Sequence, residues 1–456
     1  MTTLHIESLG CARNDVDSEE LAGRFAAAGY ELVEESVDAE VVVINTCGFI
    51  EAAKQESIDE ILTAARLKDD GRVRTVVATG CLAQRYGSDL AASLPEADGI
   101  IGFDGYDDIA STVEAILAGA RVDAPQPRDR RLILPIAPAA RRGEDTPLRE
   151  PWLPSNRVRL SGSPMAALKI ASGCDRRCAF CAIPSFRGAF QSRPMDEIVA
   201  EARWLAGQGV KELFLVSENT TSYGKDLDLA RPLESLLARL AEIDGIEWIR
   251  LSYLQPAEVR PSLIEAVAST PKVTPYFDLP FQHGSGSVLR RMRRFGAADS
   301  FLGLLERVRQ AIPNAGVRSN VIVGFPGETE ADVDMLTDFL GEASLDAVGV
   351  FPYSDEEGTE GAGLDGHLDE AEIAARAADV AQFADTVCSI QAESRLGQTV
   401  EVLVEDREGG ETQGRASQQG PEDGHTVVIG GDWSVGQILR GRVDGVDGVD
   451  WRVRPQ

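Results

Sequence analysis

Short apolar runs alternate with amphipathic stretches over residues 1–121 of the chain. We expect strands where apolar residues are continuous and helices where they recur every three to four positions. The expected strands lie at residues 4–9, 40–45 and 73–78, and the expected helices at 18–28, capped by Ser18, and at 57–65. This alternation predicts an N-terminal doubly wound parallel sheet.

The same alternation returns over residues 161–392. The expected strands lie at residues 167–170, 212–216, 248–251 and 317–323, with helices between them such as 195–206 and 300–311. A segment of this length with this pattern predicts a β/α barrel of the TIM type, whole or partial. The fold class is therefore α/β for both of the larger domains.

Two further segments have a different composition. Residues 122–160 are interrupted by proline and by pairs of arginine, which is typical of a linker. Residues 393–456 contain short β-type runs, at 399–404 and 425–429, separated by glycine-rich turns. This tail predicts a small all-β barrel. The domains are thus 1–121, 122–160 as linker, 161–392 and 393–456.

Composition excludes several classes of protein. The chain has 456 residues, of which 43% are hydrophobic, and no apolar run long enough for a transmembrane helix. Its first residues lack the basic and apolar regions of a signal peptide. The formal net charge is −29, whereas proteins that bind nucleic acid usually present a basic face. We expect no membrane association and no direct binding of RNA.

Cys174, Cys178 and Cys181 form a C-x3-C-x2-C motif. Iron–sulfur clusters bind cysteine thiolates, and three ligands on a [4Fe–4S] cube leave one iron open. A structural zinc site requires four ligands, and no further cysteine or histidine lies nearby in the sequence. A cluster is the favoured interpretation, with zinc or incidental thiols as alternatives. Thiols used as metal ligands also indicate a reducing cytoplasm.

Cys11, Cys47 and Cys81 each follow one of the first three expected strands. Because the carboxyl ends of parallel strands lie at one edge of an open sheet, these cysteines are expected to converge. We therefore predict a second cluster with three protein ligands. Three buried apolar thiols are the alternative. The seventh cysteine, Cys388, is expected to be a lone thiol on a helix.

From end to end the chain resembles the methylthiotransferases, a radical S-adenosylmethionine family. The first segment is similar to the N-terminal domain of that family, the centre to its radical domain and the tail to its TRAM module. The runs that carry the resemblance, besides the six cysteines, are residues 44–50, 53–58, 183–188, 275–283 and 323–330. The segment Ser217-Glu218-Asn219 departs from the sequence pattern of the family.

The resemblance implies two [4Fe–4S] clusters and S-adenosylmethionine as cofactors. The first cluster would be bound by Cys174, Cys178 and Cys181, with S-adenosylmethionine on its open iron. The second, bound by Cys11, Cys47 and Cys81, would supply the sulfur of a methylthio group. Placing that group on an unactivated carbon requires radical chemistry, which a cofactor must provide.

Other site residues are predicted from their positions beside these motifs. Phe180 is expected to pack beside the first cluster. Arg187 is expected to pair with the carboxylate of S-adenosylmethionine or with a substrate aspartate, and His283 to contact substrate, although a histidine at this place is more often only hydrogen-bonded in position. The expected S-adenosylmethionine contacts are Ser217, Glu218, Asn219, Gln282 and Gly324. No residue is assigned a catalytic role.

The resemblance is closest to the branch that adds the methylthio group to the β-carbon of an aspartate of ribosomal protein uS12. Partners would be uS12, free or in the small subunit, and an electron donor such as flavodoxin or ferredoxin. Acidic residues outnumber basic ones in the tail, which suits a basic protein substrate. A transfer-RNA adenosine methylthiotransferase and a non-catalytic iron–sulfur electron-transfer protein remain alternatives.

Overall fold

The structure, a computed structural model, describes residues 1–127, 129–130 and 157–456. Most of the linker predicted at 122–160 lies outside the described residues. The chain forms two compact units, which are described separately. The N-terminal unit contains residues 1–162, 172–176 and 182–191, and the second unit contains residues 163–171, 177–181 and 192–456.

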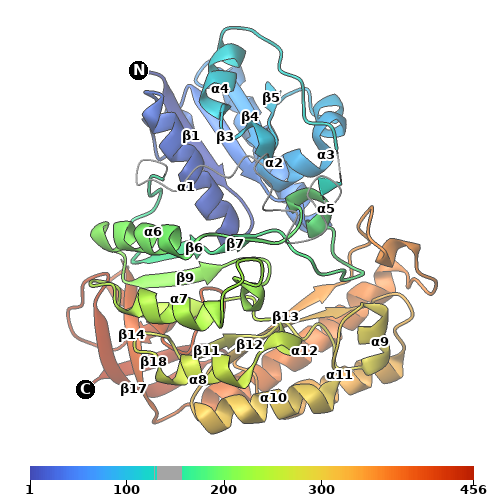
Figure 1. Cartoon of the computed structure of the whole chain (residues 1–456), viewed down its shortest axis with the longest axis vertical. Helices are drawn as coiled ribbons and strands as arrows, with labels where there is room; N and C mark the ends of the chain where they lie inside the picture. The colour runs from blue at the N-terminus through green and yellow to red at the C-terminus, as the bar shows by residue number, and fades with distance from the viewer. Residues whose placement is uncertain (128, 131–156) are drawn as a thin grey trace. The chain divides into compact units, whose positions relative to one another are not determined.

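A parallel sheet with strand order β2-β1-β3-β4-β5 forms the N-terminal unit (Figure 1). Its register pairs Leu4 of β1 with Val41 of β3, and Val41 with Thr75 of β4. The strands are β1 (Thr3–Ser8), β2 (Glu31–Leu32), β3 (Val41–Thr46), β4 (Thr75–Thr79) and β5 (Gly99–Ile100), and the helices are α1 (Ala12–Ala27), α2 (Glu51–Asp69), α3 (Gly80–Ser93) and α4 (Ile109–Leu117). This confirms the predicted doubly wound sheet, with its topological switch between β1 and β3.

Helices cover both faces of this sheet because successive side chains of each strand point to opposite faces. Val42 and Ile44 of β3 belong to a core cluster with residues of α2 and α3. Val41 and Val43 belong to the opposite cluster, with residues of α1 and α4. Every residue of β3 is buried, as expected for a strand inside a parallel sheet.

The predicted start of the first helix was wrong. Helix α1 begins at Ala12, with Cys11 at its N-cap position, and Ser18 is a buried mid-helix residue that donates a hydrogen bond to Ser8 Oγ. The first two turns of α1 contain polar residues such as Asn14 and Asp17, which are buried. Because those side chains are polar, the apolar periodicity appeared only one turn later.

The second unit contains a partial β/α barrel. Its strands form two parallel sheets, of order β6-β9-β10 and β11-β12-β13, and a parallel bridge from Ile249 to Val273 connects β10 to the residues before β11. The strands are β6 (Met165–Lys169), β9 (Glu212–Val216), β10 (Trp248–Leu251), β11 (Tyr276–Asp278), β12 (Gly316–Val323) and β13 (Ala347–Pro352). The partial form of the predicted barrel is therefore confirmed.

Helices alternate with these strands and enclose the large apolar core of the unit (Figure 1). They are α6 (Met195–Gly207), α7 (Pro232–Ala241), α8 (Pro261–Ser269), α9 (Gly286–Arg291), α10 (Ala298–Ala311), α11 (Glu330–Ala343) and α12 (Glu370–Ser394). Helix α5 (Ile183–Arg187) belongs to the N-terminal unit, and β7 (Ala171–Ser172) and β8 (Gln191–Ser192) lie where the chain passes between the units. Cys388 is buried in α12, as expected.

The tail closes into the predicted β-barrel, with strand order β14-β15-β16-β18-β17. Its strands are β14 (Thr399–Glu408), β15 (Glu411–Ala416), β16 (Thr426–Val428), β17 (Ile438–Asp447) and β18 (Asp450–Pro455). A buried ion network attaches this barrel to the partial β/α barrel. Arg415 of β15 pairs with Glu212 of β9, and Glu212 also pairs with Arg250 of β10.

Within the described part of the chain, no helix is both long and apolar enough to span a membrane.

Candidate functional site

Cys11, Cys47 and Cys81 lie at the carboxyl ends of neighbouring strands. Cys11 follows β1, Cys47 follows β3 and Cys81 is the second residue of α3, directly after β4. Because β1, β3 and β4 are adjacent in the sheet, the three residues lie at one edge. The thiols are close enough that both Cys11 and Cys47 act electrostatically on Cys81. The structure thus brings together residues that are far apart in sequence.

Glycines let the polypeptide approach these cysteines closely. Gly10 has a φ of +94°, and a Cβ at that position would lie 2.9 Å from Cys47 Sγ. Gly80 has a φ of +91°, and a Cβ there would collide with Asn45 Oδ1. Other residues rarely adopt this backbone region, and here a side chain would also displace its neighbour. Glycine beside Cys11 and beside Cys81 is therefore required by the geometry of the edge.

Polar side chains fix the backbone around the three cysteines. Asn14 donates to the Leu9 and Thr46 carbonyls, and so connects the ends of β1 and β3. Ser57 of α2 accepts from the Cys47 backbone N–H at 2.9 Å and also lies within hydrogen-bonding distance of the Cys47 carbonyl. These residues are buried, so the cysteine loops are held by satisfied hydrogen bonds rather than by solvent.

Two arginines donate to thiols of this group. Arg13 Nη2 lies 3.5 Å from Cys11 Sγ, and Arg187 Nη2 lies 3.2 Å from Cys81 Sγ. Burial raises the pKa of Cys81 to about 11, and the charge of Arg187 acts in the opposite direction. Burial also acts to raise the pKa of Cys11, but Arg13 and Arg187 together bring that pKa below its usual value. The site therefore favours thiolate at Cys11 most.

Several side chains of the N-terminal unit contact Arg187. It is held by Asp17, with Nη2 3.0 Å from Asp17 Oδ2, and it donates to Asn14 Oδ1 at 2.8 Å. Its guanidinium stacks over the ring of Phe103, 4.8 Å from the centroid. The predicted pairing with S-adenosylmethionine or substrate is not tested by these contacts. They place Arg187 beside Cys81 in the N-terminal unit.

The donor set of this edge fits an iron–sulfur cluster better than a single metal ion. All seven cysteines are free thiols. Over residues 1–127, 129–130 and 157–456, no three histidine, cysteine or acidic side chains are placed to hold one metal ion. A cube distributes its thiolate ligands over different irons, so they stand farther apart than the ligands of one zinc. Cys11, Cys47 and Cys81 offer three free thiols at this edge for such a cube.

The C-x3-C-x2-C loop has its own supports in each unit. In the N-terminal unit the Cys174 N–H donates to the Gly188 carbonyl, and Cys174 Sγ accepts from the Arg176 N–H at 3.4 Å. In the second unit Arg294 Nη1 lies 3.7 Å from Cys178 Sγ. Each of these three cysteines is partly exposed. An arginine donor thus accompanies this motif as well.

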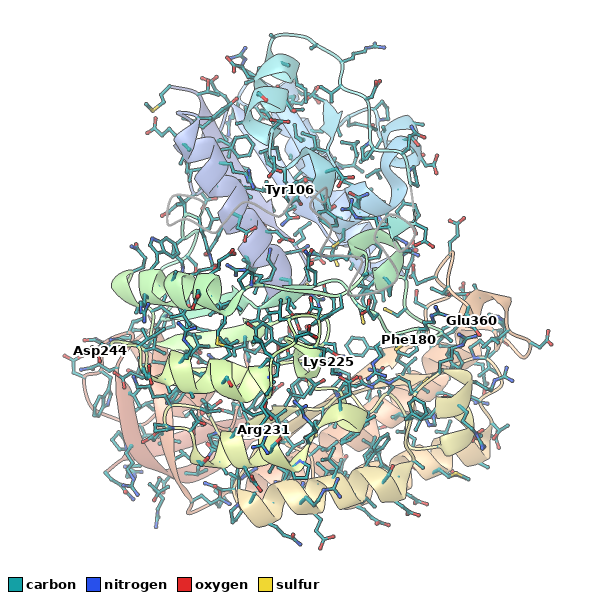
Figure 2. The ribbon with its side chains drawn as sticks, viewed as in Figure 1. Tyr106, Phe180, Lys225, Arg231, Asp244 and Glu360 are labelled. Carbon is teal, nitrogen blue, oxygen red and sulfur yellow. The ribbon has the colours of Figure 1, made fainter. Side chains whose placement is uncertain are left out.

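Phe180 and the residues after β9 occupy the second unit. Phe180 is partly buried and packs against the apolar core (Figure 2). Ser217 is buried, and its Oγ lies 3.2 Å from Thr220 Oγ1. Asn219 donates from Nδ2 to Glu258 Oε2, while Glu218 is partly exposed at the carboxyl end of β9. Their predicted contacts with S-adenosylmethionine stay predictions.

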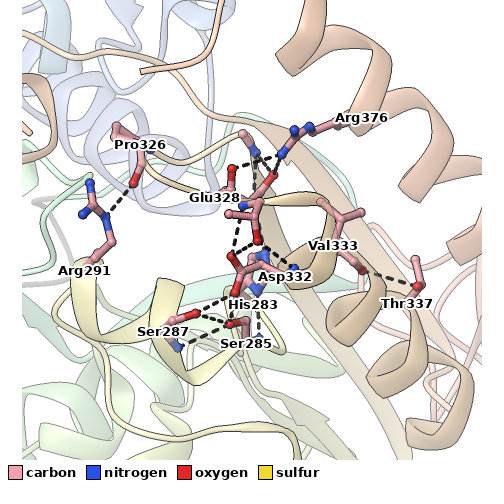
Figure 3. Close-up of polar contacts among 12 residues, drawn as sticks. His283, Ser285, Ser287, Arg291, Pro326, Glu328, Asp332, Val333, Thr337 and Arg376 are labelled. Atoms are coloured by element: carbon pink, nitrogen blue, oxygen red, sulfur yellow. Dashed lines mark hydrogen bonds and ion pairs between the residues drawn. The ribbon is translucent and has the colours of Figure 1, made fainter. Parts of the chain in front are cut away.

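Glu328 organises the residues after β11 and β12 (Figure 3). Both of its carboxylate oxygens accept from the Gly324 N–H, at 3.0 and 2.9 Å. His283 Nε2 lies 3.2 Å from Glu328 Oε2, and its Nδ1 accepts from the Ser285 N–H. Arg376 of α12 pairs with the same carboxylate. His283 is fully buried with both ring nitrogens engaged, so the contacts observed are structural.

The predicted cofactor contacts Gly324 and Gln282 adopt constrained backbone conformations. Gly324 has a φ of +85°, and a Cβ there would lie 2.7 Å from Ile373 of α12. Gln282 has a φ of +73° and bonds through its backbone to Asn320 and Ile322. These constraints shape the loops at the carboxyl ends of the barrel strands, where barrel active sites lie.

Sequence reasoning missed several residues that support the cysteines or the Gly324 loop: Arg13, Asn14, Asp17, Ser57, Arg294 and Glu328. The position of Arg13 and Asn14 directly after Cys11 was a usable signal. Arg294 lies in a basic run, residues 290–294, that composition alone did not connect with Cys178. Glu328 lies in the run 323–330 that carries the resemblance, although no role was assigned to it, and Asp17 gave no signal in the sequence.

Two family descriptions match the chain. Residues 3–102 match the uncharacterized protein family UPF0004, and residues 168–340 match the radical SAM superfamily. The first range contains Cys11, Cys47 and Cys81, and the second contains the C-x3-C-x2-C motif.

Curated relatives are similar over nearly the whole chain. A protein of Kineococcus radiotolerans named ribosomal protein uS12 methylthiotransferase RimO is 57% identical, covering 98% of this chain and 96% of its own length. Proteins of the same name from Saccharopolyspora erythraea and Nocardioides sp. are 56% and 58% identical, each over 98% of this chain and over 94% and 96% of the relative.

Solved structures support the fold. The radical S-adenosylmethionine methyltransferase TsrM of Kitasatospora setae, bound to tryptophan and an S-adenosylmethionine analogue, matches with a TM-score of 0.53 and 16% identity, over 77% of this chain and 74% of its own. TsrM with cobalamin and a [4Fe–4S] cluster also matches with a TM-score of 0.53.

Proposed function

The chain belongs to the RimO family of radical S-adenosylmethionine methylthiotransferases, and we propose that it adds a methylthio group to the β-carbon of an aspartate of ribosomal protein uS12. The observation that carries this proposal is the identity of 54–58% to proteins of that name over 92% or more of the chain. The convergence of Cys11, Cys47 and Cys81 at one sheet edge supports it independently of the comparison.

Two [4Fe–4S] clusters and S-adenosylmethionine are the cofactors of this function. Cys174, Cys178 and Cys181 would hold one cluster, and Cys11, Cys47 and Cys81 the other. When bound, these groups supply reductive cleavage of S-adenosylmethionine, which generates a radical able to take hydrogen from an unactivated carbon, and the sulfur that replaces that hydrogen.

The residues of the chain supply ligands, charge and fixed loops. Arg13 and Arg187 place positive charge beside the thiols of the N-terminal unit, and Arg294 does the same beside Cys178. Glu328 holds the Gly324 loop at the carboxyl end of β12. Burial of Cys47 and Cys81 limits access of water to that edge. We assign S-adenosylmethionine contacts to the loops after β9, β11 and β12, which include Ser217, Gln282 and Gly324.

Substrate identity is tested by mass spectrometry in the source cells. We expect uS12 from cells that carry the gene to contain one methylthio increment on an aspartate, and uS12 from deletion cells to lack it. Bulk transfer RNA from the two strains is measured in parallel and should be unchanged. Loss of a methylthio nucleoside with unmodified uS12 in both strains would instead assign the transfer-RNA activity.

The two-cluster assignment is tested by iron analysis of anaerobically reconstituted protein. The intact chain should bind about eight irons, and a chain with Cys11, Cys47 and Cys81 changed to alanine about four. The altered chain should still cleave S-adenosylmethionine when reduced but should not modify uS12. An intact chain that binds only about four irons would contradict the proposal.

We propose that the reductant is a flavodoxin or ferredoxin. We also propose that the reaction takes place in the reducing cytoplasm.

A further inference from the structure

Arg187 is buried next to a predicted cluster ligand. It is the last residue of α5, and only 6% of its side chain is exposed. Its Nη2 atom lies 3.0 Å from Asp17 Oδ2, 2.8 Å from Asn14 Oδ1 and 3.2 Å from Cys81 Sγ. A guanidinium fixed at this many points cannot easily turn away from the sulfur.

Burying this charge is costly unless it is paired, and Asp17 supplies one pairing carboxylate. A salt bridge with Asp17 alone would not require an N–H directed at Cys81. The third contact, with the thiol, therefore distinguishes Arg187 from an ion pair that serves only to attach α5. The positive charge also acts on Cys11 and Cys47, so its field covers the whole group.

Arg187 follows Cys181 by only six positions in the chain, yet the segment 182–191 belongs to the N-terminal unit. Ala182, Ile183 and Phe186 of this segment pack against Cys81 and Phe103 in a small apolar cluster. The segment that follows the first cysteine motif thus encloses a cysteine of the second group and excludes water from it. A donor in such a dry site acts more strongly than one in water.

We propose that Arg187 is a positioning residue for the cluster at Cys11, Cys47 and Cys81, and that its hydrogen bond to Cys81 raises the reduction potential of that cluster. The inference rests on the two-cluster assignment made above. Reduction adds negative charge that is shared with the cysteine sulfurs, and a cationic donor stabilises the reduced form more than the oxidised form. Hydrogen bonds to the sulfurs are among the factors that set cluster potentials.

The test uses the full chain with Cys174, Cys178 and Cys181 changed to alanine, so that only the N-terminal cluster assembles. In this background we compare Arg187→Gln, Arg187→Lys and the double variant Asp17→Asn/Arg187→Gln. The double variant also removes the buried carboxylate that loses its Arg187 partner in Arg187→Gln. The matched control is Arg24→Gln, which breaks a surface pair with Asp107 in the same unit. The measurement is a redox titration followed by electron paramagnetic resonance, with iron content determined on each sample.

We expect a more negative midpoint potential in Arg187→Gln and in the double variant, a smaller shift in Arg187→Lys, and none in Arg24→Gln. If Arg187→Gln retains too little iron to titrate, the midpoint potential is compared in the other two Arg187 variants. Equal midpoints in all of the iron-loaded variants would overturn the inference and leave the proposed function intact. Failure of the parent chain to bind iron at all would overturn the N-terminal cluster, and the inference with it.

Discussion

Arg415 of the tail barrel donates to Glu212, the first residue of β9, across 2.7 Å, and both side chains are almost completely buried. Although burial opposes ionisation, Arg250 and Arg415 bring the pKa of Glu212 below its usual value. The carboxylate therefore stays charged between two arginines. The pair fixes the tail barrel at the amino end of the β9 strand, at the opposite end from the predicted S-adenosylmethionine loops.

Replacing Arg415 with alanine should destabilise the second unit. The change leaves Glu212 and Glu405 without their shared partner, and breaking a buried ion pair costs about 3–5 kcal/mol. The free energy of unfolding is measured with urea. The control is Arg407→Gln, which breaks an exposed pair with Asp432 on the same barrel and should cost at most about 1 kcal/mol. Equal losses in both variants would show that the buried network does not attach the barrel.

Gly10→Ala should remove the N-terminal cluster. The positive φ costs about 1–2 kcal/mol for alanine, and the added Cβ would push Cys47 Sγ away from the cluster. Gly29→Ala is a close control, because Gly29 has a φ of +91° but no heavy atom within 4 Å of the added Cβ. Both variants should bear the cost of the positive φ, but only Gly10→Ala should lose about half of the bound iron. Full iron content in Gly10→Ala would show that Cys47 is not a ligand.

Asp278 makes stability depend on pH. Burial raises its pKa to about 6 in the folded protein, against 3.8 for the ordinary group. The folded state therefore binds more protons between these values, and the stability contributed by Asp278 is lost as the pH rises from about 4 to about 6. At neutral pH the ionised form costs about 3 kcal/mol, since one pKa unit corresponds to about 1.4 kcal/mol.

Asp278→Asn keeps the shape of the side chain without its charge. It should be more stable than the parent at pH 7.5 to about that extent, and the difference should vanish near pH 4. Urea unfolding of both chains at a series of pH values measures the difference directly, so that other titrating groups cancel. A difference that is independent of pH would show that Asp278 titrates normally.

Glu328→Gln should weaken the binding of S-adenosylmethionine. The amide cannot accept with both of its terminal atoms from Gly324, His283 and Arg376, so the loop after β12 should shift. Small displacements of a binding loop cost up to about 100-fold in activity. Equilibrium dialysis of reconstituted protein measures the affinity. Glu372→Gln, which removes an exposed partner of the same Arg376, should bind S-adenosylmethionine with normal affinity. Equal affinities in the two variants would exclude a cofactor contact in this loop.

The sequence determined the secondary structure wherever the pattern was local and apolar. The buried run at β3 and the strand at β9 could be read directly, because continuous apolar residues in a short segment are buried on both faces of a parallel sheet. The first residues of the helices were harder to predict from the sequence. The polar residues that support Cys11 concealed the first turn of α1, and residues 51–56, none of which is buried, concealed that of α2.

The composition of the tail also did not show where its charged residues lie on the barrel. The tail is acidic overall, yet Arg440, Arg442, Arg452 and Arg454 all lie on the exposed side of β17 and β18. Alternation along each strand and the pairing of Arg442 with Arg454 place them on one face. The net charge of a segment does not show where its charged side chains lie. Only the register of the barrel revealed that these four arginines form a row.

By itself, the sequence determined the family, the six cysteines and the order of strands and helices, because spacing and periodicity are properties of neighbouring residues. Only the tertiary structure decided that Arg187 reaches Cys81, that Arg415 reaches Glu212 and that Glu328 reaches His283. Each of these contacts joins residues from separate segments, and their side chains meet only because sheet order and packing bring those segments together.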